Sequence, residues 1–178
     1  HGATNGCMQL TGDPRRLANE PGMPGVVHVM DPEPYDFQFG QNDAEKVARN
    51  LQYLEEVITY EGPETIAAMF IETVTGTNGI LPPPEGYLQG LRALLDKYGI
   101  LLVCDEVMCG FGRTGKMFAF EHGDIVPDIL TMAKGLTSAY APLGCMAVSD
   151  DIAAHFREHV FWGGLRTQGA CCQARQVG

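Results

Sequence analysis

Short apolar runs with no polar alternation recur along this chain, and several of them end abruptly at a charged residue. A run of this kind is typical of a strand buried on both faces, as in a parallel sheet. Each run has the length of an ordinary strand, so the pattern predicts a sheet in the interior of the protein. The predicted strands cover residues 66–71, 100–104, 129–132 and 143–148.

Two stretches between the runs have helical spacing instead. Asn42 is a predicted N-cap for a helix that extends to about residue 60, and the glycine of Gly62-Pro63 ends it. A second helix, residues 85–98, carries its leucines on one face and stops at Gly99. This helix lies between the predicted strands 66–71 and 100–104, which makes a right-handed βαβ unit. We therefore predict an α/β fold, a mostly parallel sheet with flanking helices.

The regions outside this pattern are rich in glycine and proline. Residues 1–6 contain too many glycines for an element interior and are predicted to be a loop. Residues 11–34 carry five prolines and are predicted to be extended on the surface, with a short strand at residues 26–30. Near the other end, residues 149–151 are a predicted cap for a helix that extends to about residue 159.

Composition narrows the functional classes. The chain has 178 residues, enough for one domain with a core, and a formal net charge of −10 that argues against nucleic acid and anionic membranes. No apolar run approaches the roughly 20 residues that span a bilayer. The six cysteines include no CxxC pair, so we expect reduced thiols in a cytoplasmic protein and no metal site.

Candidate chemistry gathers where the apolar runs end. Asp105 follows one run, Glu72 ends another, and Lys134 comes shortly after a third. Parallel sheets place their sites at the carboxyl ends of the strands, so an acid and an amine are expected together. A lysine amine can form a Schiff base with pyridoxal phosphate, and a buried carboxylate keeps the ring nitrogen of that cofactor protonated. Val107 could then pack against the ring.

A glycine-rich loop in the same region allows another interpretation. Residues 110–115 match GxGxxG, and residues 110–116 match GxxxxGK, so a nucleotide-binding module is an alternative. The phosphate loop requires Ser or Thr after its lysine, where this chain has Met117. Both motifs should open a helix facing phosphate, and the sequence after Lys116 is short and aromatic.

Two segments, LLVCDEVMCGFGRTGKMFAFEH and PDILTMAKGL, resemble the class III aminotransferases, the omega-aminotransferase group of fold-type I pyridoxal phosphate enzymes. The resemblance implies that Asp105 contacts the pyridine nitrogen, Val107 the ring face, and Lys134 forms the Schiff base. It places Glu72 near the substrate pocket, where it can pair with a gateway arginine. Many members have Gln where this chain has Met108, so that contact with the cofactor's ring oxygen must be absent or replaced.

The resemblance also concerns the two ends of the chain. His1-Gly2 matches the last two residues of an aromatic-His-Gly motif at the cofactor, so the chain resembles a fragment that begins inside the active site. It lacks the family's phosphate cup, small domain and substrate-carboxylate arginine. Residues 1–164 are expected to be part of the large, cofactor-binding domain. Residues 165–178 depart from the family, and we expect an atypical tail, without the cofactor role for Thr167.

The reaction implied by the resemblance is transamination between a primary (omega) amine and a keto acid such as pyruvate. Within the family, HGATNGCMQLTGDPRR and DEVMCGFGRTGKMF look most similar to taurine–pyruvate and omega-amine–pyruvate aminotransferases. Family resemblance also implies a homodimer in the full-length protein. The fragment alone is expected to turn over poorly, an inactive truncated remnant remains an alternative, and the amine donor is left open.

Overall fold

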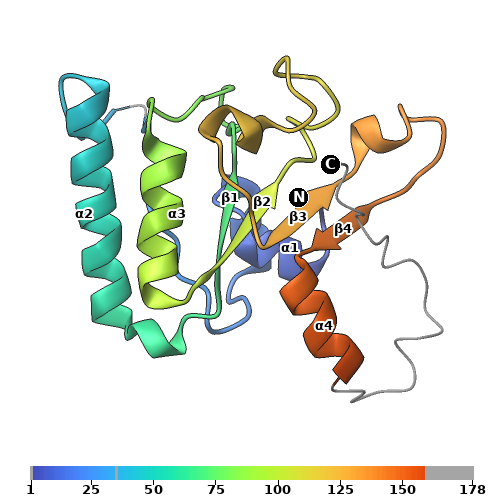
Figure 1. Cartoon of the computed structure of the whole chain (residues 1–178), viewed down its shortest axis with the longest axis horizontal. Coiled ribbons are helices and arrows are strands. Elements are labelled where there is room, and N and C mark those ends of the chain that lie inside the picture. Colours follow the sequence, from blue (N-terminus) through green and yellow to red (C-terminus); the bar gives the residue numbers. More distant parts are fainter. Residues whose placement is uncertain (1, 35, 159–178) are drawn as a thin grey trace.

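In the part of the chain that the structure describes, the sheet has four strands and is mostly parallel, as the sequence predicts (Figure 1). The structure, a computed structural model, describes residues 2–34 and 36–158. The strand order is β1-β2-β3-β4, with β1 parallel to β2, β2 parallel to β3, and β4 antiparallel to β3. The strands are β1 (Ala68–Glu72), β2 (Leu101–Asp105), β3 (Ile129–Met132) and β4 (Cys145–Val148).

The two long helices begin and end close to where the sequence predicts. In the longer helix, the Asn42 side chain accepts a hydrogen bond of 3.0 Å from the Glu45 amide, and Gly99 closes the second helix in a left-handed conformation with φ 66°. The α-helices are α1 (Asn5–Leu10), α2 (Asp43–Glu61), α3 (Tyr87–Tyr98) and α4 (Asp150–Glu158). The 3₁₀ turns are η1 (Pro14–Asn19), η2 (Pro63–Thr65), η3 (Ala119–Gly123) and η4 (Lys134–Leu136).

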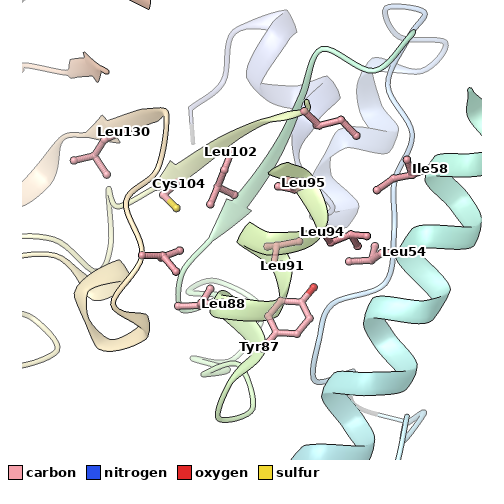
Figure 2. Packing of buried hydrophobic residues seen from close by; sticks show 12 residues of the cluster. Leu54, Ile58, Tyr87, Leu88, Leu91, Leu94, Leu95, Leu102, Cys104 and Leu130 are labelled. Carbon is pink, nitrogen blue, oxygen red and sulfur yellow. The ribbon is translucent and has the colours of Figure 1, made fainter. Parts of the chain in front are cut away.

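The hydrophobic core lies between one face of the sheet and the side-by-side helices α2 and α3 (Figure 2). Leu91 and Leu95 of α3 and Leu102 of β2 are completely buried. Each such leucine contributes roughly 1.5–3 kcal/mol relative to an exposed position. The opposite face is more open, since Phe70 of β1 is 47% exposed and Met146 of β4 is 51% exposed.

Asp128 joins three strands at the end of the sheet where β2 and β3 begin. Its Oδ2 accepts hydrogen bonds from the Leu102 amide (2.7 Å) and from Arg92 Nη1 of α3 (2.6 Å). Its own amide donates to the Leu102 carbonyl, and its carbonyl accepts from Ser149, directly after β4. One residue therefore fixes β2, β3, β4 and the crossover helix in register.

Two predictions of local structure are wrong. Residues 26–30 form no strand, because Val27 and Met30 are exposed and the segment follows the surface without pairing with the sheet. Residues 1–6 are not entirely loop, since α1 begins at Asn5 and includes Gly6. Within residues 2–34 and 36–158, no helix is long and apolar enough to cross a membrane.

Candidate active site

Three candidate residues lie at one edge of the sheet, where the parallel strands end. Glu72 of β1 and Asp105 of β2 are register partners, and Thr131 of β3 is opposite Asp105 on the other side. Lys134 follows three positions later, at the start of η4. The fold therefore places Asp105 and Lys134, which the sequence separates by 29 positions, at the same end of the sheet, because β2 and β3 are parallel neighbours.

Asp105 is the carboxylate at the centre of this edge. It is half-buried, and its Oδ1 accepts a hydrogen bond of 2.9 Å from the Val107 amide. This bond turns the chain immediately after β2 and fixes one carboxylate oxygen. Val107 is itself only 8% exposed, so an apolar side chain lies close to the carboxylate in sequence and is held by the fold.

Glu72 is a second half-buried carboxylate, on the neighbouring strand. Its Oε2 accepts a hydrogen bond of 2.9 Å from the Gly76 amide. Burial raises the pKa of Glu72, and the charges of Asp105 and Asp31 raise it further, whereas the Gly76 bond lowers it. Gly76 also lies against Met108, because a Cβ at Gly76 would be 2.9 Å from the Met108 Cε. Met108 thus packs beside Glu72.

The amine of Lys134 has no hydrogen-bond or ion-pair partner within the described part of the chain. The other three lysines are engaged: Lys46 with Glu33, Lys97 with Glu55, and Lys116 with the Glu121 carbonyl. Lys134 is exposed and lines an open depression together with Thr137, Ala139, Ala141, Pro142 and Leu143. Its backbone is left-handed, with φ 36°, a conformation that non-glycine residues rarely adopt.

Glu106 is not part of the open edge, although the sequence places it beside Asp105. It is completely buried, and its carboxylate accepts hydrogen bonds from Thr73 Oγ1 (2.7 Å) and from the amides of Ala119 (3.0 Å) and Phe120 (2.9 Å). Successive side chains at a strand end point to opposite sides, so only one carboxylate of the pair can face the site. Glu106 instead anchors the segment that follows the glycine loop.

The glycine loop at residues 110–116 does not have the geometry of a nucleotide-binding loop. It folds back on itself, with the amides of Phe111 and Gly112 donating to the Met117 carbonyl, and it opens no α-helix. The next element is the 3₁₀ turn η3, and Lys116 donates to the Glu121 carbonyl at 2.7 Å. The helix N-terminus that would face phosphate is therefore missing, and the nucleotide alternative has no structural support.

The remaining candidates are at the start of the chain. Gly2 is exposed with φ 132°, and a Cβ placed on it would be 3.2 Å from the Cys7 Sγ of α1. His1 and residues 159–178, which include Thr167, lie outside the described residues. The part that is described contains no group of three His, Cys, Asp or Glu side chains able to hold a metal ion.

Comparison with known proteins shows similarity to aminotransferases over most of the chain. The aminotransferase class-III family matches residues 1–164. Taurine–pyruvate aminotransferase of Bilophila wadsworthia is 38% identical, and the match covers 98% of this chain and 41% of that protein. Diaminobutyrate–2-oxoglutarate transaminase of Halomonas elongata is 57% identical over a shorter stretch, 56% of this chain and 21% of that protein.

The fold of this chain is also similar to solved structures of aminotransferases. A taurine:2-oxoglutarate aminotransferase from Bifidobacterium kashiwanohense, in complex with PLP and glutamate, is 50% identical with a TM-score of 0.85, covering 90% of this chain and 37% of that one. An omega-transaminase from Thermomicrobium roseum is 47% identical, also with a TM-score of 0.85, covering 89% and 36%.

The chain belongs to the class III aminotransferase family, whose members depend on pyridoxal phosphate. Its fold is part of a fold-type I transaminase. It spans about two fifths of the length of the curated relatives that it matches over nearly its whole length.

Proposed function

We propose that the protein from which this chain comes catalyses pyridoxal phosphate-dependent transamination between a primary (omega) amine and a keto acid such as pyruvate. Lys134 is the residue that bonds covalently to the cofactor aldehyde. One observation carries the proposal: the lysine amine without a partner in the described structure lies at the same sheet edge as the half-buried Asp105. An uncommitted amine can attack a carbonyl, whereas an amine held by a carboxylate must first break that pair.

The residues at this edge fit the cofactor by their chemistry. Pyridoxal phosphate, when bound, supplies an electron sink that stabilises negative charge on the substrate carbon. Asp105 would hold the proton of the pyridine nitrogen, because opposite charges in contact favour the charged forms. Val107, which is buried next to it, would pack against the ring face. After exchange with the substrate, the Lys134 Nζ would act first as base and then as acid, moving the proton from the substrate carbon that bears the amine to the cofactor carbon.

Glu72 is proposed to line the substrate pocket, one strand away from Asp105. Its carboxylate is held on one side by the Gly76 amide, so it presents a fixed orientation at the same edge. The roles of His1 and Gly2 near the cofactor rest on the family resemblance and stay predictions. A cytoplasmic location, too, stays a prediction.

The proposed assembly is a homodimer of the full-length protein. Two large side chains that follow Lys134 in the sequence support this proposal, since Tyr140 is 94% exposed and Leu143 is 58% exposed. We propose that a second copy of the chain covers them in the dimer. Analytical ultracentrifugation of the full-length protein measures its dimerisation. The variant with Tyr140→Ser and Leu143→Ser together should dimerise more weakly. A full-length protein that is monomeric at every concentration contradicts the dimer.

The lysine assignment is tested by adding pyridoxal phosphate to the 178-residue chain, reducing with borohydride and mapping the labelled peptides. We expect the label on Lys134 in preference to the three engaged lysines, and its loss from that peptide in Lys134→Ala. Lys116→Ala is the matched control, which should keep the Lys134 label. A label on other lysines with Lys134 unmodified contradicts the proposal.

The substrates are tested on the full-length protein, because the compared proteins differ in their named acceptors, pyruvate in one and 2-oxoglutarate in two. Taurine, a diamine and an aliphatic amine are each offered with both keto acids, and amino-acid product is measured. Turnover with taurine and pyruvate supports the narrower assignment. Turnover with α-amino donors alone would contradict the omega-amine specificity.

A further inference from the structure

The backbone at Lys134 requires an explanation that its own turn does not provide. A left-handed conformation costs a non-glycine residue roughly 1–2 kcal/mol, and it persists only where the surroundings enforce it. Around η4 the Leu136 amide donates to the Ala133 carbonyl at 2.9 Å, and the Ser138 amide donates to the Gly135 carbonyl at 3.3 Å. Such a single turn is too short to hold the conformation by itself, so contacts from outside it must contribute.

The outside contact comes from Phe111 in the glycine loop. A Cβ placed on Gly135 would lie 2.9 Å from the Phe111 Cβ and 2.9 Å from its Cδ2, closer than real Cβ atoms come. The backbone next to Lys134 therefore rests directly on the Phe111 side chain. Only glycine fits at position 135 without displacing either the turn or the phenylalanine.

Phe111 is itself held firmly. Its backbone is left-handed, with φ 62°, and its amide donates to the Met117 carbonyl at 2.6 Å. Its ring meets the Phe118 ring edge to face, with 5.6 Å between centroids, and Phe118 stacks on Phe120 at the same separation. Contacts of this kind between aromatic rings restrict the positions that the Phe111 ring can take.

The aromatic stack in turn depends on the buried Glu106. The carboxylate accepts the amides of Ala119 and Phe120, which fixes the segment that carries the rings. Glu106 is joined directly to Asp105. A continuous series of contacts therefore leads from the strand end that carries the candidate acid, through the rings, to the turn that carries the candidate amine.

We propose that Phe111 is a positioning residue for Lys134, and that it acts through Gly135 by holding the turn of the lysine in its left-handed conformation. This inference rests on the proposed function in one respect: positioning of Lys134 matters because its amine attacks a carbonyl. The contact between Phe111 and Gly135 itself requires no cofactor.

The test is a double-mutant cycle in the 178-residue chain with Gly135→Ala, Phe111→Gly and the two together. Hydrogen exchange of the Leu136 amide reports on the turn, and exchange of the Leu95 amide in α3 reports on the whole fold. We expect each single variant to speed Leu136 exchange by about tenfold without changing Leu95. In the Phe111→Gly background, Gly135→Ala should add less than about twofold, since the atoms that it strikes have been removed.

A second readout ties the turn to the chemistry. The share of reduced pyridoxal phosphate label on Lys134, relative to the other three lysines, should fall in both single variants and be kept in Phe111→Leu, which retains an apolar side chain. Leu91→Ala, a core variant far from the loop in sequence, controls for general loosening of the fold.

The outcomes separate the two proposals. Unchanged Leu136 exchange in both single variants, an equal effect of Gly135→Ala in both backgrounds, or an equal loss of Lys134 label in Leu91→Ala overturns the positioning role. Label on other lysines with Lys134 unmodified in the unsubstituted chain contradicts the proposed function instead, and the exchange results then still decide the role of Phe111.

Discussion

The two ends of the central sheet differ in how far their polar groups are satisfied. At the amino ends of the parallel strands, Asp128 is bonded to the Leu102 amide and to Arg92, and its backbone is paired on both sides. At the carboxyl ends, the Lys134 amine has no partner in the described structure, its backbone is left-handed, and burial raises the pKa of Glu72.

The difference shows that one sheet can separate stability from chemistry. Pairing at the amino ends fixes the register of β2, β3 and β4 and needs no group to remain reactive. At the carboxyl ends, the Lys134 amine has no partner in the described structure, and the pKa of the Glu72 carboxyl group is raised. Leaving such groups unpaired or partly buried costs stability, and it keeps them available to bind or react. Glu106 is the exception at the carboxyl end, since it is buried and fully engaged.

The largest effect should follow removal of the paired acid at the amino end. Asp128→Ala leaves the Leu102 amide without its acceptor and removes one of the two carboxylates that pair with Arg92, which keeps Asp96. We expect the free energy of unfolding to fall by about 3 kcal/mol. Denaturant unfolding measures it. Asp128→Asn, which keeps an acceptor for the amide but not the charge, should lose less. A cost of Asp128→Ala below about 0.5 kcal/mol, the range of an ordinary surface change, would contradict the view of this end as the stabilising one.

The hydrogen bonding of the buried Glu106 at the carboxyl end can be tested by substituting Thr73. Thr73→Val removes the hydroxyl that donates to the buried Glu106 carboxylate while keeping the side-chain shape, and we expect a loss of about 1–2 kcal/mol. Thr75→Val is the control, because Thr75 is in the same loop and bonds to Leu81 through its backbone. Equal effects of the two substitutions would mean that the hydroxyl of Thr73 contributes nothing specific.

Lys134→Gly should raise the stability of the fold and abolish cofactor labelling at the same position. Glycine adopts positive φ without penalty, so we expect the free energy of unfolding to rise by up to about 1 kcal/mol while cofactor labelling at position 134 is lost. Lys134→Ala lacks the amine but keeps the strain and should show no such rise. A stability of Lys134→Gly below that of Lys134→Ala would show that the left-handed conformation carries no strain.

The smallest effect concerns the pH dependence contributed by Glu72. Its folded-state pKa lies above the ordinary value of 4.5, so its contribution to stability is complete below the unfolded-state pKa and is lost as the pH rises through the folded-state pKa. Glu72→Gln stays neutral and should therefore gain stability relative to the unmodified chain as the pH is raised from about 4 to about 7.

Urea unfolding at several pH values measures this difference. Glu64→Gln is the control, because it makes the same chemical change at an exposed side chain. A Glu72→Gln difference that stays constant, or that shrinks as the pH rises, contradicts a raised pKa for the buried carboxylate.

Local patterns were sufficient to predict the main elements. The Asn42 cap, the Gly99 stop and the run before Asp105 each depend on near neighbours in sequence, and the structure agrees at all three. The predicted strand at residues 26–30 is wrong because a short apolar run can be either a strand or an exposed segment. Only a pairing partner elsewhere in the chain decides between the two. The start of α1 at Asn5 was missed because its glycine gave a loop signal.

The sequence by itself determined the α/β class, the βαβ unit and the family, because residue spacing and a specific motif carry that information. Only the tertiary structure decided which of two adjacent carboxylates faces the edge, which lysine amine stays uncommitted, and that Phe111 supports the backbone at Gly135. These features depend on contacts between residues far apart in the chain, and their geometry is set by how β1, β2 and β3 lie beside one another.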